Sequence, residues 1–447
     1  MRESHHDLPV VANDPWRSGA HARWAVLLCS CAWAGWAAAQ SMPADESLLK
    51  DARVGYNART FYMDVDYPDG TSREAWTFGG KVYGLTGYWD KRLQFGASYY
   101  FSLPLYAPDD RDGTALLAPG QEQLSVIGEL FARLRVADEA TLTVGRQEID
   151  MSPERADFVR SNRSDATYVG RLDNRMVPFT YQAALLEAQL AAPLTAYAAW
   201  IDRAKPRNSN HFVPMGEAVG AVGSDSPMGF GGLQWTPAQG VMLQAWMHDV
   251  PDVLRIAFVD GDFVWPLGDK RYLRVAGQYT DQRSTGSNEL EAGRPFSTHN
   301  AQLYGEAGID AVKLYGALSR TGEGSAIRTP FSSGPIYTQQ VTRSFVDAGE
   351  KAWQVGLAFE LGALLPGLSG WLDYTAGRDL IDAASGAALP DETETNLGLV
   401  WSLRQKGSLF DGLRARFRFA WVTDKAPTGN EDTTDLRVDI NLPLRWL

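Results

Sequence analysis

The sequence predicts an all-β fold, an antiparallel transmembrane β-barrel of about eighteen strands, with sixteen as the alternative, in which one loop folds inward as a constriction. Three observations predict it. Apolar and polar residues alternate with a period of two along most of the chain, as in strands whose two faces meet different surroundings. Several of these strands carry arginine on one face only. No apolar run reaches the roughly eighteen to twenty residues that a membrane-crossing helix needs.

The first segment of the chain is predicted to be a secretory signal peptide, residues 1–39, with cleavage after Ala39. Arg17 and Arg23 precede an apolar run that begins at Ala25 and ends in small residues. Two alternatives stay open. The start codon could be misassigned, since the leader is long and holds as many acids as bases, or Cys29 could belong to a lipoprotein signal. Residues 40–447 are expected to form a single barrel domain.

Cysteine usage and charge exclude several classes of function. Both cysteines, Cys29 and Cys31, lie in the expected signal peptide, so the mature chain has no disulfide, no thiol nucleophile and no cysteine ligand for a metal. The formal net charge of −12 makes nucleic acid an unsuitable partner. No motif requires a cofactor or a metal.

The last two predicted strands show the alternation best. In the final strand one face carries polar residues, Arg437 and Asp439 among them, and the other face is apolar: Leu436, Val438, Ile440, Leu442, Leu444 and Trp446. In the strand before it, Arg414, Arg416 and Arg418 share one face. Arginine on the lipid side would cost roughly 2 to 4 kcal/mol near the bilayer midplane. The arginine face is therefore expected to be wet.

The remaining strands follow the same pattern. Their expected ranges are 52–62, 74–88, 92–103, 122–136, 140–147, 181–191, 194–202, 228–235, 240–249, 253–265, 271–281, 298–308, 310–320, 351–361, 368–376, 394–404, 412–422 and 434–446. Short links at 136–140, 191–194 and 308–310 are expected to be periplasmic turns. Long polar links are expected to be outer loops: 104–121, 148–181, 203–228, 281–298, 321–351, 377–393 and 423–433.

Aromatic residues support a membrane barrel over a soluble β protein. The chain has 15 Trp, 17 Tyr and 18 Phe, and several lie near predicted strand ends, where a bilayer interface favours amphipathic rings. A soluble protein would place the charged faces on its outside, whereas a barrel places them in a water-filled lumen. Closure of the sheet also removes the unpaired edges that a large open sheet would expose.

Three segments resemble a known family. They are VGRQEID from Val144, NRMVPFT from Asn174, and DAGEKAWQVGLAFELGALLPGLSGWLDYTAGRD from Asp347. Together they resemble the OprD family of substrate-selective outer-membrane porins. The resemblance implies a monomeric or loosely trimeric barrel of about eighteen strands. It also implies a narrow eyelet shaped by an inward-folded loop, and uptake of small nutrients that carry a carboxylate.

A row of guanidinium groups along the lumen wall would lower the barrier for such a carboxylate. The candidates for this basic ladder are Arg133, Arg135, Arg274, Arg414, Arg416 and Arg418. The alternative is that these arginines are ordinary solvated residues of the wall and have no part in selecting the solute. Charged residues of the loop 148–181 are candidates for the constriction: Asp150, Asp157, Asp165, Asp173 and Arg175. They could set a field across the pore, or be ordinary residues of an exposed loop.

The expected function is passive, selective uptake of small anionic or zwitterionic solutes: amino acids, small peptides or aromatic acids. The alternatives are a general non-selective porin, an adhesive or structural barrel and an outer-membrane hydrolase. Catalysis is not expected, since His248 is next to Asp249 but no serine suggests a triad. The expected partners, besides the solute, are outer-membrane lipid, lipopolysaccharide and the barrel-assembly machinery, and the expected location is the bacterial outer membrane.

Overall fold

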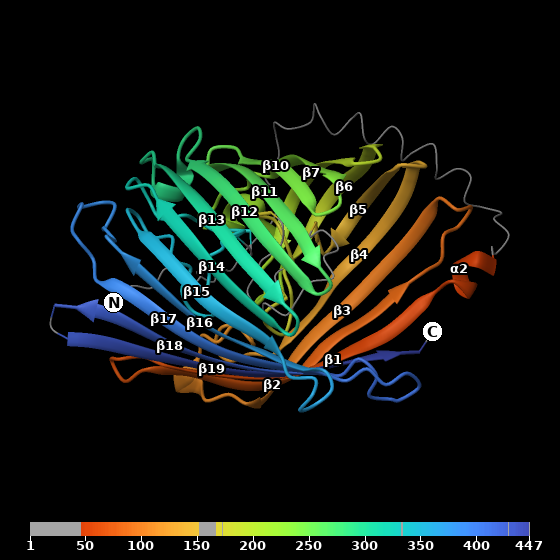
Figure 1. Ribbon diagram of the computed structural model, residues 1–447. Helices are drawn as coiled ribbons and strands as arrows, with labels where there is room; N and C mark the ends of the chain where they lie inside the picture. The colour runs from red at the N-terminus through yellow and green to blue at the C-terminus, as the bar shows by residue number, and fades with distance from the viewer. Residues whose placement is uncertain (1–45, 152–166, 172, 332–333, 428, 447) are drawn as a thin grey trace.

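A computed structural model describes residues 46–151, 167–171, 173–331, 334–427 and 429–446 (Figure 1). In this part of the chain 19 strands form one sheet, in which paired neighbours are antiparallel. β8 has two residues and pairs only with β7, and the other 18 strands form the wall of a barrel. The wall is closed because β1 pairs with β2 on one side and with β19 on the other.

The strands of the first half of the wall are β1 (Arg53–Asp66), β2 (Ser72–Leu85), β3 (Leu93–Tyr106), β4 (Leu124–Ala137), β5 (Ala140–Gln147), β6 (Thr180–Ala191), β7 (Leu194–Lys205), β9 (Met228–Ala238) and β10 (Val241–Val250). Those of the second half are β11 (Leu254–Gly268), β12 (Arg271–Arg283), β13 (Ser297–Ile309), β14 (Val312–Thr321), β15 (Lys351–Glu360), β16 (Leu368–Arg378), β17 (Asp391–Ser402), β18 (Arg414–Ala426) and β19 (Gly429–Arg445).

Short elements complete the described chain: α2 (Glu46–Lys50), η1 (Asp109–Arg111), β8 (Val213–Pro214), α3 (Met215–Ala218) and η2 (Glu289–Glu291). Among the described residues there is no helix with both the length and the apolar character required to traverse a bilayer. The expected signal peptide, residues 1–39, lies outside the described part of the chain.

The two faces of the wall are inverted relative to a soluble protein. Along β13 the buried residues include Thr298, Asn300 and Gln302, while Leu303 on the opposite face is 52% exposed. The same inversion places Trp421 of β18 outside, whereas Arg418 on its other face is buried. An apolar exterior and a polar interior are the arrangement of a membrane barrel. The prediction of fold class is confirmed.

Connections of two kinds alternate around the barrel. One rim, here called the short-turn rim, carries two-residue links at 138–139, 192–193 and 310–311. The other, the long-loop rim, carries the connections 107–123 and 148–179, and a further one at 322–350. One expected long loop is wrong: β18 continues to Ala426 and pairs with Gly429 of β19, so the link expected at 423–433 consists largely of paired strand. The polar residues there are part of the wall, because strands can extend beyond the bilayer.

Several connections of the long-loop rim fold into the barrel. One apolar cluster joins Ile149 and Tyr168 of the connection 148–179 to Phe331 of the connection 322–350 and to Phe258 of β11. A second cluster joins Leu116, Met176 and Val177 from two connections to Phe61 and Tyr100 of the wall. These clusters fill part of the barrel with packed side chains. The polar remainder of the lumen is therefore the candidate region for a solute site.

Candidate functional site

The site is built on the inner faces of β18 and β19, which pair directly. Arg416 and Arg418 project from β18, and Asp439 of β19 is the cross-strand neighbour of Arg416. The Arg416 Nε atom lies 2.8 Å from Asp439 Oδ2, and the Arg418 Nη2 atom lies 3.5 Å from the same oxygen. One carboxylate is therefore shared by two guanidinium groups, which leaves the group with a net positive charge.

Arg418 has donors to spare. It is 1% exposed, and its Nε and Nη2 atoms have no hydrogen-bond partner among the described residues. Its cross-strand neighbour is Arg437, which is held by Asp435 at 2.5 Å and by the carbonyl oxygen of Val341 at 3.0 Å. A buried donor without a partner is costly, and a charged one more so. An anion or ordered water bound here would satisfy it.

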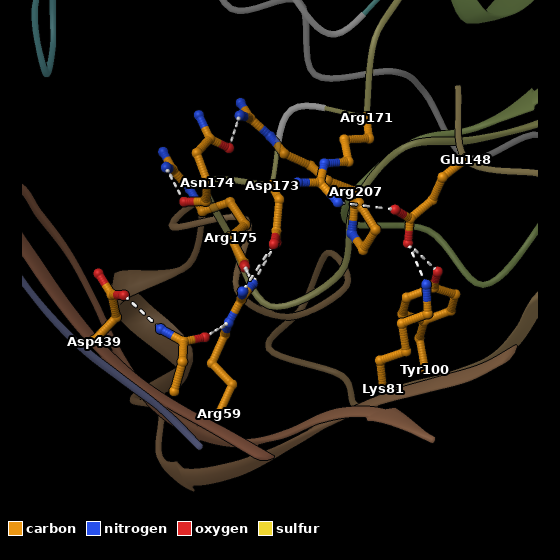
Figure 2. Close-up of polar contacts among 12 residues, drawn as sticks. Arg59, Lys81, Tyr100, Glu148, Arg171, Asp173, Asn174, Arg175, Arg207 and Asp439 are labelled. Atoms are coloured by element: carbon orange, nitrogen blue, oxygen red, sulfur yellow. Dashed lines mark hydrogen bonds and ion pairs between the residues drawn. The ribbon is translucent and has the colours of Figure 1, made fainter. Parts of the chain in front are cut away.

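The connection 148–179, here called the inward loop, meets this wall through an ion pair. Asp173 of the loop accepts hydrogen bonds from Arg59 of β1, with 2.5 Å from Nη1 to Oδ1 and 2.9 Å from Nη2 to Oδ2 (Figure 2). Arg59 also donates to Asn441 of β19 and to the carbonyl oxygen of Arg175. The bidentate pair therefore ties the loop to the strands that carry the basic wall.

A second contact ties the beginning of the same loop to β2 and β3. Glu148 accepts hydrogen bonds from Lys81 at 2.8 Å and from Tyr100, and a third, longer one from Arg171 at 3.4 Å (Figure 2). Lys81 also lies 2.7 Å from Glu129 of β4. Glu148 and Asp173 are thus two of the residues through which the inward loop is fastened to the wall.

Basic residues of the loops add to the positive potential near Arg418. Arg175 donates to the carbonyl oxygens of Thr114 and Asn174, and Arg207 donates to the Asn174 side chain (Figure 2). Burial lowers the pKa of Arg175, and repulsion from Arg437 and Arg207 lowers it further. Burial and repulsion from Arg437 also lower the pKa of Arg207, to about 10. The region therefore favours a negatively charged occupant.

The connection 322–350, here called the second inward loop, covers the acidic side of the same region. Glu394 of β17 accepts hydrogen bonds from the backbone of Thr342 at 3.0 Å and of Arg343 at 2.7 Å. The Arg343 side chain lies 2.7 Å from Asp424 of β18, and the Tyr337 hydroxyl donates to Asp260 of β11. The connection lies on the long-loop rim, where the long link was expected, and the contacts of its described residues show that it also folds into the barrel.

The predicted ladder residues are not brought together in one row. Arg414 lies beside Arg416 and Arg418 on β18. Arg274 of β12 forms a buried ion pair of 2.6 Å with Asp262 of β11. On β4, Arg133 donates to Gln94 at 3.1 Å, and Arg135 is exposed and lies over the Tyr88 ring. Three candidates thus belong to the region described above, and the others lie elsewhere on the wall.

The predicted constriction residues also separate. Asp173 and Arg175 lie at the basic wall, while Asp150 pairs with Arg171 of its own loop at 3.2 Å. Asp157 and Asp165 lie outside the described residues. The sequence reasoning missed Arg59, because the inner face of β1 continues as Phe61, Met63 and Val65, which are covered by loops and break the polar pattern.

A sequence profile described as "outer membrane porin, OprD family" matches residues 46–446. Among curated protein sequences there is no match. The chain is similar to solved structures of Pseudomonas porins, and the three described below are 19% to 20% identical to it.

The first of these structures is Pseudomonas aeruginosa OpdK with vanillate, which has a TM-score of 0.72 at 20% identity and covers 89% of this chain and 100% of its own. Pseudomonas aeruginosa OccK9 (OpdG) has a TM-score of 0.75 at 20% identity with the same coverage. A BenF-like porin from Pseudomonas fluorescens Pf-5 has a TM-score of 0.73 at 19% identity, again covering 89% and 100%.

Proposed function

Because this chain belongs to the OprD family of outer membrane porins, we propose that it is a passive, selective channel for small solutes that carry a carboxylate. Membership of the family indicates that the protein lies in the outer membrane and functions as a porin. The finer proposal concerns the solute: an amino acid, a small peptide or an aromatic acid. No catalytic role is proposed for any residue.

The observation that carries the proposal is the buried guanidinium of Arg418. Its Nε and Nη2 atoms have no hydrogen-bond partner among the described residues, and Asp439 is shared with Arg416. A solute carboxylate could accept two parallel hydrogen bonds from one guanidinium group, a geometry that suits Arg and carboxylate. The carboxylate would add the negative charge that Asp439 alone does not supply.

The neighbouring inward loops favour a solute with an apolar part as well. Met176 and Val177 of the inward loop pack beside Phe61 of β1, whose ring also lies 5.9 Å from the Arg418 guanidinium carbon. A site with a fixed cationic hydrogen-bond donor beside apolar side chains fits a small organic acid better than an inorganic anion. The relative OpdK was solved with vanillate, which is an aromatic carboxylate.

Planar-bilayer recording tests the proposal. We expect discrete current steps, a reversal potential that shows anion preference, and a lower anion preference in Arg418→Gln. Arg135→Gln is the matched control, because it removes the same charge from an exposed position at the short-turn rim. Retention of heat-modifiable mobility in gels shows that each variant is folded. Equal reversal potentials for wild type and Arg418→Gln would indicate a general porin and overturn the carboxylate proposal.

A solute panel in liposome-swelling assays tests the substrate class. Benzoate-like acids should enter faster than neutral solutes of equal size, and Arg418→Gln should remove the difference. If neutral sugars enter as fast as acids of the same size, the selectivity proposal is wrong. Absence of current together with lipase or protease activity would favour a barrel hydrolase instead.

A further inference from the structure

Three basic residues form a row on the outer surface of the barrel. Arg320 of β14 is the cross-strand neighbour of Lys351 of β15, which is in turn the neighbour of Arg378 of β16. All three are exposed and alternate with buried residues that face the interior. Each lies at the end of its strand nearest the long-loop rim, so the row occupies the upper margin of the lipid-facing wall.

The charge of this row is only partly compensated. Lys351 pairs with Asp379 at 2.8 Å, and both side chains are about half exposed. Among the described residues, neither Arg320 nor Arg378 has an ion pair or a hydrogen bond from its guanidinium group. Like charges on directly opposed strand positions repel one another. An external anion would relieve that repulsion.

The row continues across the next two strands as Asp391 of β17 and its cross-strand partner Lys425 of β18. Asp391 accepts a hydrogen bond from the backbone of Asp379, so it is partly occupied with the chain itself. Four cations therefore face two carboxylates along the row.

The surface beside the row is apolar. Leu318 lies two residues from Arg320 and Trp353 lies two residues from Lys351, and they are cross-strand neighbours that are 57% and 44% exposed. Val355 continues the exposed apolar surface along β15. A tryptophan between charged and apolar residues is typical of the membrane interface. The row thus stands where acyl chains end and headgroups begin.

We propose that Arg320, Lys351 and Arg378 form a binding site for the phosphate groups of lipopolysaccharide in the outer leaflet. Guanidinium and ammonium groups bind phosphate through charge-assisted hydrogen bonds, and the apolar surface below receives the acyl chains of the same molecule. The site lies on the outer face, so it is independent of the solute pathway proposed above.

The same rim offers a matched control. Arg255 of β11 and Arg283 of β12 are also exposed cross-strand neighbours on the outer face. Each already has an acid, with Arg255 2.7 Å from Asp249 and Arg283 2.5 Å from Asp281. The variants Arg320→Gln/Arg378→Gln and Arg255→Gln/Arg283→Gln therefore remove equal charge from equivalent positions, but only the second pair removes cations that already form a close ion pair with an acid.

Native mass spectrometry of the full-length barrel in detergent tests the proposal with lipid A that carries both phosphates. We expect Arg320→Gln/Arg378→Gln to bind it roughly tenfold more weakly than wild type, and Arg255→Gln/Arg283→Gln to bind it as wild type does. Unchanged single-channel conductance shows that both variants keep the folded wall.

Two probes identify the source of the phosphate. Dephosphorylated lipid A should bind wild type as weakly as the bisphosphorylated lipid binds Arg320→Gln/Arg378→Gln. Inorganic phosphate at millimolar concentration should not displace the bisphosphorylated lipid. Equal binding of both lipids, complete displacement by inorganic phosphate, or an equal loss in the control variant would each overturn the proposal.

Discussion

Arg59 of β1 and Asp173 of the inward loop, which are 114 residues apart, form a bidentate ion pair inside the barrel. Arg59 is held from the other side by Asn441 of β19. The guanidinium group therefore connects the seam where the barrel closes to the loop that narrows the lumen. The position of the loop depends on a charge pair as well as on packing.

Asp173→Asn should loosen the inward loop. The Asp173 side chain is 34% exposed, so the pair contributes a modest amount, about 1 kcal/mol by analogy with other solvent-accessible pairs. We expect larger fluctuations of the open-channel current, measured in planar bilayers, with the barrel still folded. Asp150→Asn is the control, because Asp150 pairs within its own loop. Equal current noise in Asp173→Asn and wild type would show that packing alone holds the loop.

The same pair predicts an acid-resistant loop position. Burial by itself would raise the pKa of Asp173, but the attraction and hydrogen bonds of Arg59 outweigh burial and lower the pKa well below its ordinary value. A carboxylate whose pKa is lower in the folded state stabilises the folded state at every pH above its unfolded pKa of about 3.9. That contribution is lost as the pH falls through the folded-state pKa.

Current noise of the wild type should therefore stay constant on acidification to about pH 4 and rise only below it. The current noise of Asp173→Asn should be high at every pH. The difference in current noise between wild type and Asp173→Asn therefore reports on this ion pair and not on other carboxylates of the lumen. A rise in wild-type noise centred above pH 4 that Asp173→Asn lacks would contradict the prediction.

The buried pair of Arg274 and Asp262 should stabilise the wall without selecting the solute. Its side chains are 6% and 2% exposed. Asp262→Ala leaves a buried cation without its acid and should destabilise the barrel by about 3 kcal/mol, measured by urea unfolding. The double variant Arg274→Met/Asp262→Leu should recover most of that loss. If the double variant loses anion preference as Arg418→Gln is expected to, Arg274 belongs to the solute pathway after all.

Glu350 should make the second inward loop sensitive to alkaline pH. The residue is fully buried, its Oε1 atom has no hydrogen-bond partner among the described residues, and Oε2 accepts from the backbone of Asp347 at 2.8 Å. Burial raises the pKa of Glu350 well above its ordinary value, and repulsion from Glu392 raises it further. The stabilising contribution of the neutral form is complete below the unfolded pKa and is lost as pH rises through the folded value.

Glu350→Gln keeps the neutral shape at every pH. It should match wild type near pH 4 and unfold at a higher temperature than wild type near pH 9, with the melting temperature in detergent as the measurement. Glu360→Gln, at an exposed position near the short-turn rim, should follow wild type at both pH values. A Glu350→Gln variant that is less stable than wild type at alkaline pH would show that the charged form is the one the fold requires.

The wall could be predicted from the sequence because a membrane imposes one rule on every strand. The expected range 140–147 coincides with β5, and the arginines of β18 face the interior as the alternation required. The prediction of a loop at 423–433 was wrong because this rule ends with the bilayer. Polar residues beyond the bilayer still pair as strands, but they have no apolar face by which the sequence would show it.

The interior of the barrel could not be predicted in the same way. Phe331 and Ile336 of the second inward loop follow no period, because packing inside the lumen sets their positions. The inner face of β1 turns from Arg59 to Phe61 for the same reason. The partners of the predicted arginines, Asp439 and Asp262, depend on which strands are neighbours, and that information lies in the closed sheet.

Closure through β1 and β19 also governs how the protein is made. Twelve residues of β1, from Gly55 to Asp66, pair with β19, which lies at the opposite end of the described chain and is synthesised after β1. Until β19 pairs with it, β1 has an unpaired backbone edge that could form hydrogen bonds with any other extended chain. β19 must therefore be synthesised and exported before the wall can close, and a copy that lacks β19 keeps an unpaired β1 edge.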